Sequence, residues 1–118
     1  MDGNEHRLLI VDDDAVVAET TALVFVQAGY EVRVALSAEQ ALRLIREWGP
    51  SAAIIEVLLS GMSGIELAEV IQRNCPDCRI VLFTTPAVDG APTSGSAFLT
   101  LTKPVHPTEL LTIVGAHR

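Results

Sequence analysis

Residues 52–64 read Ala-Ala-Ile-Ile-Glu-Val-Leu-Leu-Ser-Gly-Met-Ser-Gly, an apolar run of strand length that meets one carboxylate, Glu56. The run gives way within a few residues to a turn rich in Gly and Ser. This pattern predicts a buried strand at residues 52–57, with Glu56 near its carboxyl end. Open α/β sheets place their chemistry at that end of their strands.

Strands and helices are predicted to alternate along the rest of the chain. Further strand-like runs lie at residues 7–11, 30–35, 80–83 and 98–102. Between them, residues 15–28 contain neither Gly nor Pro, and capping-box patterns begin at Ser37 and Ser63. Pro107 is suited to the first turn of a last helix. Each of these segments is typical of a helix.

The alternation predicts a doubly wound α/β fold of the flavodoxin-like class, with a five-stranded parallel sheet in the order 2-1-3-4-5. Residues 85–97 contain two Pro, two Gly and no apolar stripe at helical spacing. The fourth helix is therefore expected to be short, distorted or absent. A chain of 118 residues that is 49% hydrophobic favours one domain, residues 1–118.

The charge balance excludes some functions. Fifteen acidic and eight basic residues give a net charge of −7, which disfavours direct nucleic-acid binding, because phosphate contacts need clustered Lys and Arg. No apolar stretch reaches the roughly 20 residues of a membrane span, and the polar amino terminus is unlike a secretory signal. We expect a soluble, cytoplasmic protein without a membrane partner.

The only cysteines are Cys75 and Cys78, spaced Cys-Pro-Asp-Cys. This spacing occurs in redox and metal sites, but redox motifs normally follow a strand and open a helix, whereas this pair precedes a strand. Zinc needs about four ligands, and the histidines show no matching spacing. We interpret the pair as two incidental thiols in a loop. A small doubly wound redox or cofactor-binding protein is a remote alternative, because no glycine-rich phosphate loop follows the first strand.

In the predicted sheet, polar side chains from four strand ends meet at one edge: Asp12, Asp13, Glu56, Thr84 and Lys103. Three clustered carboxylates repel one another unless a cation neutralises them, and Mg²⁺ prefers such oxygen ligands. Lys103 adds a fixed positive charge. A metal ion, an ammonium and a hydroxyl around a carboxylate can bind a phosphoryl group, because phosphoryl transfer needs mainly positioning and charge neutralisation.

Five motifs follow one another along the chain, and their order and spacing are informative together. They are Leu-Leu-Ile-Val-Asp-Asp-Asp, Ala-Gly-Tyr-Glu-Val, Glu-Val-Leu-Leu-Ser-Gly-Met-Ser-Gly, Ile-Val-Leu-Phe-Thr, and Lys-Pro followed by Glu-Leu-Leu. In the order and spacing of these motifs, the chain resembles the receiver domain of two-component response regulators along nearly its whole length. The resemblance implies that Asp12, Asp13, Glu56 and the Leu58 carbonyl are the positions that hold Mg²⁺. It likewise implies that Thr84 is the switch hydroxyl and that Lys103 pairs with the phosphoryl group.

The main departure is Glu56, which stands where these domains carry the Asp that accepts phosphate from a histidine kinase. One extra methylene moves the carboxylate outward by about 1.5 Å, a large error for in-line transfer among fixed ligands. Ser60 also replaces a usual Pro, and Thr100 stands at the place of a usual aromatic.

These departures predict a receiver-like signalling module that is not an enzyme and that works through protein contacts, with phosphorylation at Glu56 weak or absent. The expected partner is a histidine kinase or another signalling protein, and a homodimer is a further candidate. An ordinary phosphoaccepting receiver is the alternative.

Overall fold

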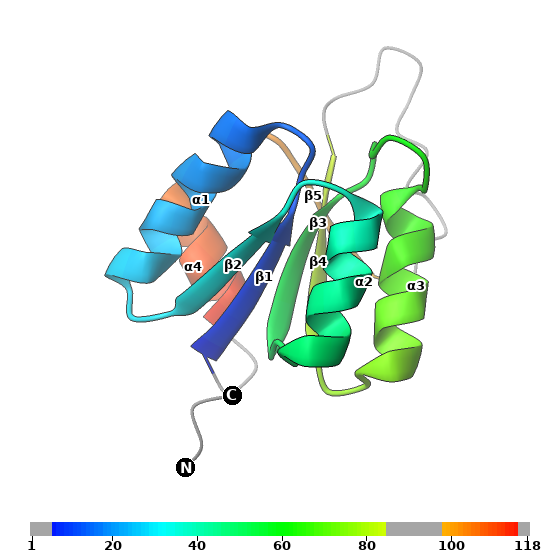
Figure 1. The fold of residues 1–118 in the computed structure, drawn as a ribbon. Coiled ribbons are helices and arrows are strands. Elements are labelled where there is room, and N and C mark those ends of the chain that lie inside the picture. The colour runs from blue at the N-terminus through cyan, green and yellow to red at the C-terminus, as the bar shows by residue number, and fades with distance from the viewer. Residues whose placement is uncertain (1–5, 85–97, 116–118) are drawn as a thin grey trace.

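The computed structural model describes residues 6–84 and 98–115 (Figure 1). Its elements, in chain order, are β1 (Arg7–Val11), α1 (Ala15–Gln27), β2 (Glu31–Ala35), α2 (Ala38–Glu47), β3 (Ala52–Glu56), α3 (Gly64–Asn74), β4 (Arg79–Thr84), β5 (Leu99–Thr102) and α4 (Pro107–Gly115). The helix predicted to be short, distorted or absent falls in residues 85–97, outside the described residues. No helix of the described part is long and apolar enough to cross a membrane.

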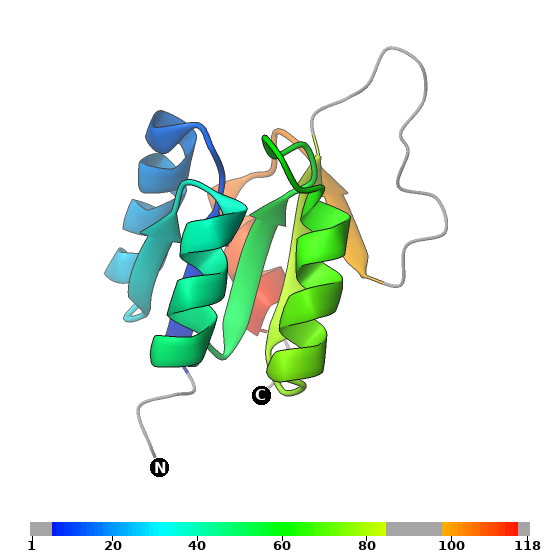
Figure 2. The same ribbon diagram turned by 45° about the vertical axis from the view of Figure 1, so that its right-hand side comes forward.

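The five strands form one parallel sheet in the order β2-β1-β3-β4-β5, which confirms the predicted topology. Helices α1 and α4 cover one face, and α2 and α3 cover the other (Figures 1 and 2). The sheet is therefore doubly wound, as the alternation of strands and helices predicts.

Each face of the sheet has its own apolar core. Leu8 and Ile10 of β1 pack in the layer with Phe25 of α1, whereas Leu9 and Val11 pack in the layer with α2 and α3. Successive side chains of a strand point to opposite faces, so a central strand must be apolar throughout. The edge strand β2 alternates between exposed and partly buried residues, in agreement with its polar and apolar alternation in sequence.

The predicted helix starts are confirmed. Asp14 caps α1 by accepting hydrogen bonds from the backbone of Val16 and Val17, and Ser63 forms a complete capping box with Glu66 at α3. At α2, the Ser37 side chain accepts from the backbone of Gln40, which confirms half of the predicted capping box, whereas the Gln40 side chain accepts from Leu36 N instead of Ser37 N. These caps fix the loops that leave the carboxyl ends of β1 and β3.

Candidate functional site

The carboxyl edge of the sheet gathers the side chains predicted for the site. In strand order they are Asp12 after β1, Glu56 at the end of β3, Thr84 at the end of β4 and Lys103 after β5. Asp12, Glu56 and Thr84 are buried, at 4%, 5% and 2% exposure. Parallel pairing continues past the strands, because Val57 N donates to Phe83 O at 2.7 Å and Lys103 N donates to Thr84 O at 2.8 Å.

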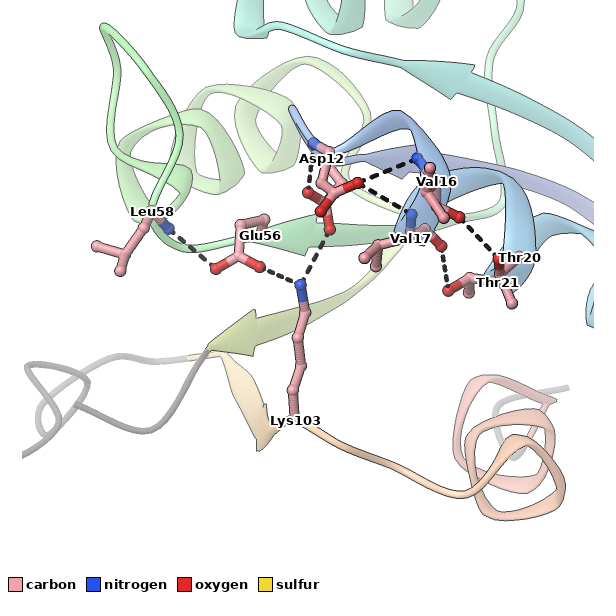
Figure 3. A network of polar contacts seen from close by, with 9 residues as sticks. Asp12, Val16, Val17, Thr20, Thr21, Glu56, Leu58 and Lys103 are labelled. Carbon is pink, nitrogen blue, oxygen red and sulfur yellow. Dashed lines mark hydrogen bonds and ion pairs between the residues drawn. The ribbon is translucent and has the colours of Figure 1, made fainter.

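Lys103 bridges the two buried acids. Its Nζ lies 3.0 Å from Asp12 Oδ2 and 2.5 Å from Glu56 Oε1, and Figure 3 shows the side chain reaching from the end of β5 to both carboxylates. Bonds between ionised groups are short and strong, more so where water is largely excluded. The Phe83 ring lies beside the ammonium, with Nζ 5.8 Å from the ring centre. One cation therefore joins strands β1, β3 and β5.

The two acids also control the ionisation of Lys103. Burial alone lowers the pKa of a lysine, but the hydrogen bonds and charges of Glu56 and Asp12 outweigh it and raise the pKa of Lys103 above its ordinary value. Lys103 consequently keeps its positive charge at physiological pH.

The remaining carboxylate oxygens are satisfied by backbone donors. Glu56 Oε2 accepts a hydrogen bond from Leu58 N at 3.2 Å, and Asp12 Oδ1 accepts one from Asp14 N at 3.0 Å. A buried carboxylate needs such donors, since an unpaired one is costly. Glu56 is thus held from one side by its own turn and from the other by Lys103.

Asp13 lies apart from this network. Its side chain is exposed and its Oδ2 accepts a hydrogen bond from Ser60 Oγ at 3.2 Å. The contact joins the loop after β1 to the loop after β3, which are distant in sequence. Sequence reasoning treated Ser60 only as a replaced Pro and missed this role, because no local pattern pairs the two loops.

Gly64 is a second residue that sequence reasoning did not single out. A β-carbon at this position would lie 2.1 Å from Glu56 O and 2.8 Å from the Val57 α-carbon. The Gly64 N–H donates to Val57 O at 2.8 Å, so the first turn of α3 rests directly on the backbone that carries Glu56. The sequence offered one hint of this role, because Gly64 directly follows the Ser63 cap and is the first residue of α3.

Comparison with known proteins shows which family the chain belongs to. The family model for the response regulator receiver domain matches residues 8–115. The chain belongs to the response regulator receiver domain family. In this receiver domain, Asp12, Asp13, Thr84 and Lys103 stand at or just after the carboxyl ends of β1, β4 and β5.

Among curated relatives, the receiver domain is 33% identical to the DNA-binding response regulator MtrA of Mycobacterium tuberculosis, over 98% of this chain and 52% of MtrA. It therefore spans about half the length of the curated relatives it matches. A CheY-like receiver domain protein of Methanospirillum hungatei superposes with a TM-score of 0.83 at 30% identity, covering 93% of this chain and 90% of that one. The response regulator TrrA of Thermotoga maritima, solved with Mg²⁺ and BeF, superposes with a TM-score of 0.80 at 27% identity, covering 93% and 96%.

The predicted metal ligands are only partly brought together in this receiver domain. Asp12, Asp13 and Glu56 have the oxygen donors that suit Mg²⁺. Within residues 6–84 and 98–115, however, no three His, Cys, Asp or Glu residues are arranged to hold a metal ion. Asp12 and Glu56 face Lys103, whereas Asp13 faces Ser60. Mg²⁺ binding by Asp12, Asp13, Glu56 and the Leu58 carbonyl therefore stays a prediction, and it would need Asp13 to turn from Ser60 toward the other two acids.

Thr100 stands where the resemblance to receiver domains leads one to expect an aromatic residue. Thr100 pairs with Leu82 of β4, and its Oγ1 donates to Phe98 O at 3.2 Å. The Phe98 side chain packs against the core on the α2 and α3 face. An aromatic residue thus lies two positions earlier, just before β5.

Proposed function

We propose that this receiver domain of a two-component system signals through protein contacts, with phosphorylation at Glu56 weak or absent. The observation that carries the proposal is the ion pair between the buried Glu56 Oε1 and the partly buried Lys103 Nζ, at 2.5 Å. The lysine implied to pair with an incoming phosphoryl group is already engaged by the residue at the acceptor position.

The length of the Glu56 side chain makes it a poor acceptor of a phosphoryl group. The extra methylene carries its carboxylate about 1.5 Å farther than an aspartate would reach, which favours contact with Lys103 over in-line attack on phosphorus. Attack on the phosphoryl donor would also require a Glu56 oxygen to give up its contact with Lys103 Nζ or with Leu58 N. Both changes raise the barrier to acyl-phosphate formation. The same carboxylate supplies part of the negative charge that a phosphoryl group would bring.

The partner we propose is a histidine kinase or another signalling protein, or a second copy of the chain, in the cytoplasm. Direct contact with nucleic acid is not part of the proposal, because the net charge of −7 opposes phosphate binding. The DNA-binding name of MtrA describes a protein about twice as long. We propose no enzymatic activity for this domain.

The test is chemical phosphorylation. The wild type, E56D and E56Q are incubated with acetyl phosphate and Mg²⁺, and acid-labile adducts are measured by intact-protein mass spectrometry. We expect no adduct on the wild type above the E56Q control, and an adduct on E56D, whose shorter carboxylate restores the family geometry. A stoichiometric adduct that maps to Glu56 would refute the proposal.

An ordinary phosphoaccepting receiver is the second candidate. The retention of Asp12, Asp13, Thr84 and Lys103 at one edge of the sheet favours it. In that case the wild type and E56D would be phosphorylated at equal rates, so the same experiment distinguishes the two functions.

A further inference from the structure

The turn between α3 and β4 brings two thiols together. Cys75 caps the end of α3, with its N–H donating to Ile71 O at 2.7 Å, and Cys78 immediately precedes β4. Cys78 N donates to Cys75 O at 3.0 Å, which closes a four-residue reverse turn. The Cys75 thiol donates to Pro50 O at 3.7 Å and the Cys78 thiol donates to Arg79 O at 3.9 Å, and neither cysteine is in a disulfide.

This geometry suits an internal disulfide. The first and last α-carbons of a β-turn lie less than about 7 Å apart, and disulfides join α-carbons about 4.4–6.8 Å apart. Pro76 stands at the second position of the turn, where its fixed φ favours the turn in the unfolded chain as well. The turn therefore holds the two α-carbons within the range that a disulfide spans, and closure needs the two side chains to turn from Pro50 O and Arg79 O toward each other.

A metal site at the turn lacks ligands. Within the described ranges 6–84 and 98–115, no group of three His, Cys, Asp or Glu residues could hold a metal ion, so no third ligand joins the two thiols there. A structural zinc needs about four. Two adjacent thiols without further ligands are suited to reversible oxidation.

The two sulfurs differ in environment. Cys75 is partly exposed, whereas Cys78 is buried in the core beneath α2 and α3. Burial, followed by the effect of Cys75, raises the pKa of Cys78 to about 12. The thiolate is the attacking form, so Cys75 is the thiol that meets an external oxidant first.

We propose that Cys75 and Cys78 form a redox-active dithiol that closes to an intramolecular disulfide when the chain meets a low-molecular-weight disulfide such as oxidised glutathione. The Cys75 thiolate attacks one sulfur of that disulfide, forming a mixed disulfide and releasing one thiolate. The Cys78 sulfur then attacks the Cys75 sulfur, giving up its proton to the departing thiolate, and the second thiol is released. The protein loses two protons and two electrons, and the external disulfide gains them as two thiols.

The dithiol is independent of the proposed function at Glu56. The turn lies where α3 runs into β4, at the opposite end of the sheet from the Lys103 pocket (Figure 2). Closing the ring would tie the end of α3 to the start of β4, whose far end carries Thr84. Disulfides of cytosolic proteins are usually transient and redox-sensing, which is the class of device proposed here.

The test uses the reduced full chain in glutathione buffers of graded oxidised fraction. After acid quenching and alkylation, intact-protein mass spectrometry counts the remaining thiols. We expect the wild type to lose two hydrogens and both alkylatable thiols while staying monomeric. C78S should stop at a glutathione mixed disulfide on Cys75. C75S should react at least about tenfold more slowly, because its remaining thiol is buried.

Circular dichroism shows that each variant is folded, and E56Q serves as a control that should oxidise like the wild type. Two unmodified thiols in the wild type under fully oxidised glutathione would overturn the proposal, as would a mixed disulfide that never closes or only disulfide-linked dimers. If a serine variant fails to fold, the number of alkylatable thiols left in the oxidised wild type still shows whether the disulfide forms.

Discussion

Lys103 balances the charge of the candidate pocket, because Asp12 and Glu56 are both buried and share its ammonium. Removing one partner of a buried pair leaves an uncompensated charge, which costs far more than losing an exposed pair. Here two carboxylates would be left facing one another. The ion pairs are therefore expected to matter for stability as well as for signalling.

Replacing Lys103 with methionine tests this at a similar side-chain length. We expect K103M to lower the free energy of unfolding by about 2–3 kcal/mol, less than for a fully buried pair because Lys103 keeps some exposure. Urea denaturation measures it. R43M, which removes one positive charge from an exposed position on α2, should change stability by less than about 0.5 kcal/mol. Equal effects in both variants would contradict the account.

The raised pKa of Lys103 predicts a specific pH dependence. A group whose pKa is higher in the folded state than in the unfolded state stabilises the fold fully below the unfolded value, about 10.5 for lysine. This contribution is lost as pH rises through the folded pKa. As the pH rises above about 10.5, the stability difference between wild type and K103M should shrink. A difference that stays constant over that range would rule out the linkage.

At the scale of elements, the site depends on how α3 begins. The first turn of α3 lies on the backbone of Glu56 and Val57, and only glycine fits at residue 64. The Ser63 capping box fixes the direction in which the helix leaves. Helix α3 thus sets the position of the end of β3, and with it the distance from Glu56 to Lys103.

Gly64→Ala should separate α3 from β3, because its β-carbon would overlap a carbonyl oxygen that cannot move alone. We expect a loss of about 2 kcal/mol, in the range of overpacked cores. Gly115→Ala is the matched control, since its β-carbon would meet the Tyr30 hydroxyl at an ordinary 3.4 Å. Thermal unfolding compares the two, and a neutral Gly64→Ala would show that the close approach is not essential.

For the whole molecule, local pattern and parallel topology were enough to predict the sheet order and the edge where Asp12, Glu56, Thr84 and Lys103 gather. Apolar runs and caps are local features, and a doubly wound sheet brings its strand ends together. The bond between Asp13 and Ser60, 47 residues apart, was not predictable, because no local pattern encodes it. The closeness of Cys75 and Cys78 also depends on how the turn between them closes.

The central claim is that Glu56 forms an ion pair with Lys103 and so prevents the pocket from accepting a phosphoryl group. A crystal structure determined in Mg²⁺ and beryllofluoride, which imitates a bound phosphoryl group, tests it most directly. We predict that Lys103 Nζ stays within hydrogen-bond distance of Glu56 and Asp12, with no beryllium bonded to Glu56. A fluoroberyllate on a Glu56 oxygen, with Lys103 turned to its fluorides, would contradict the account.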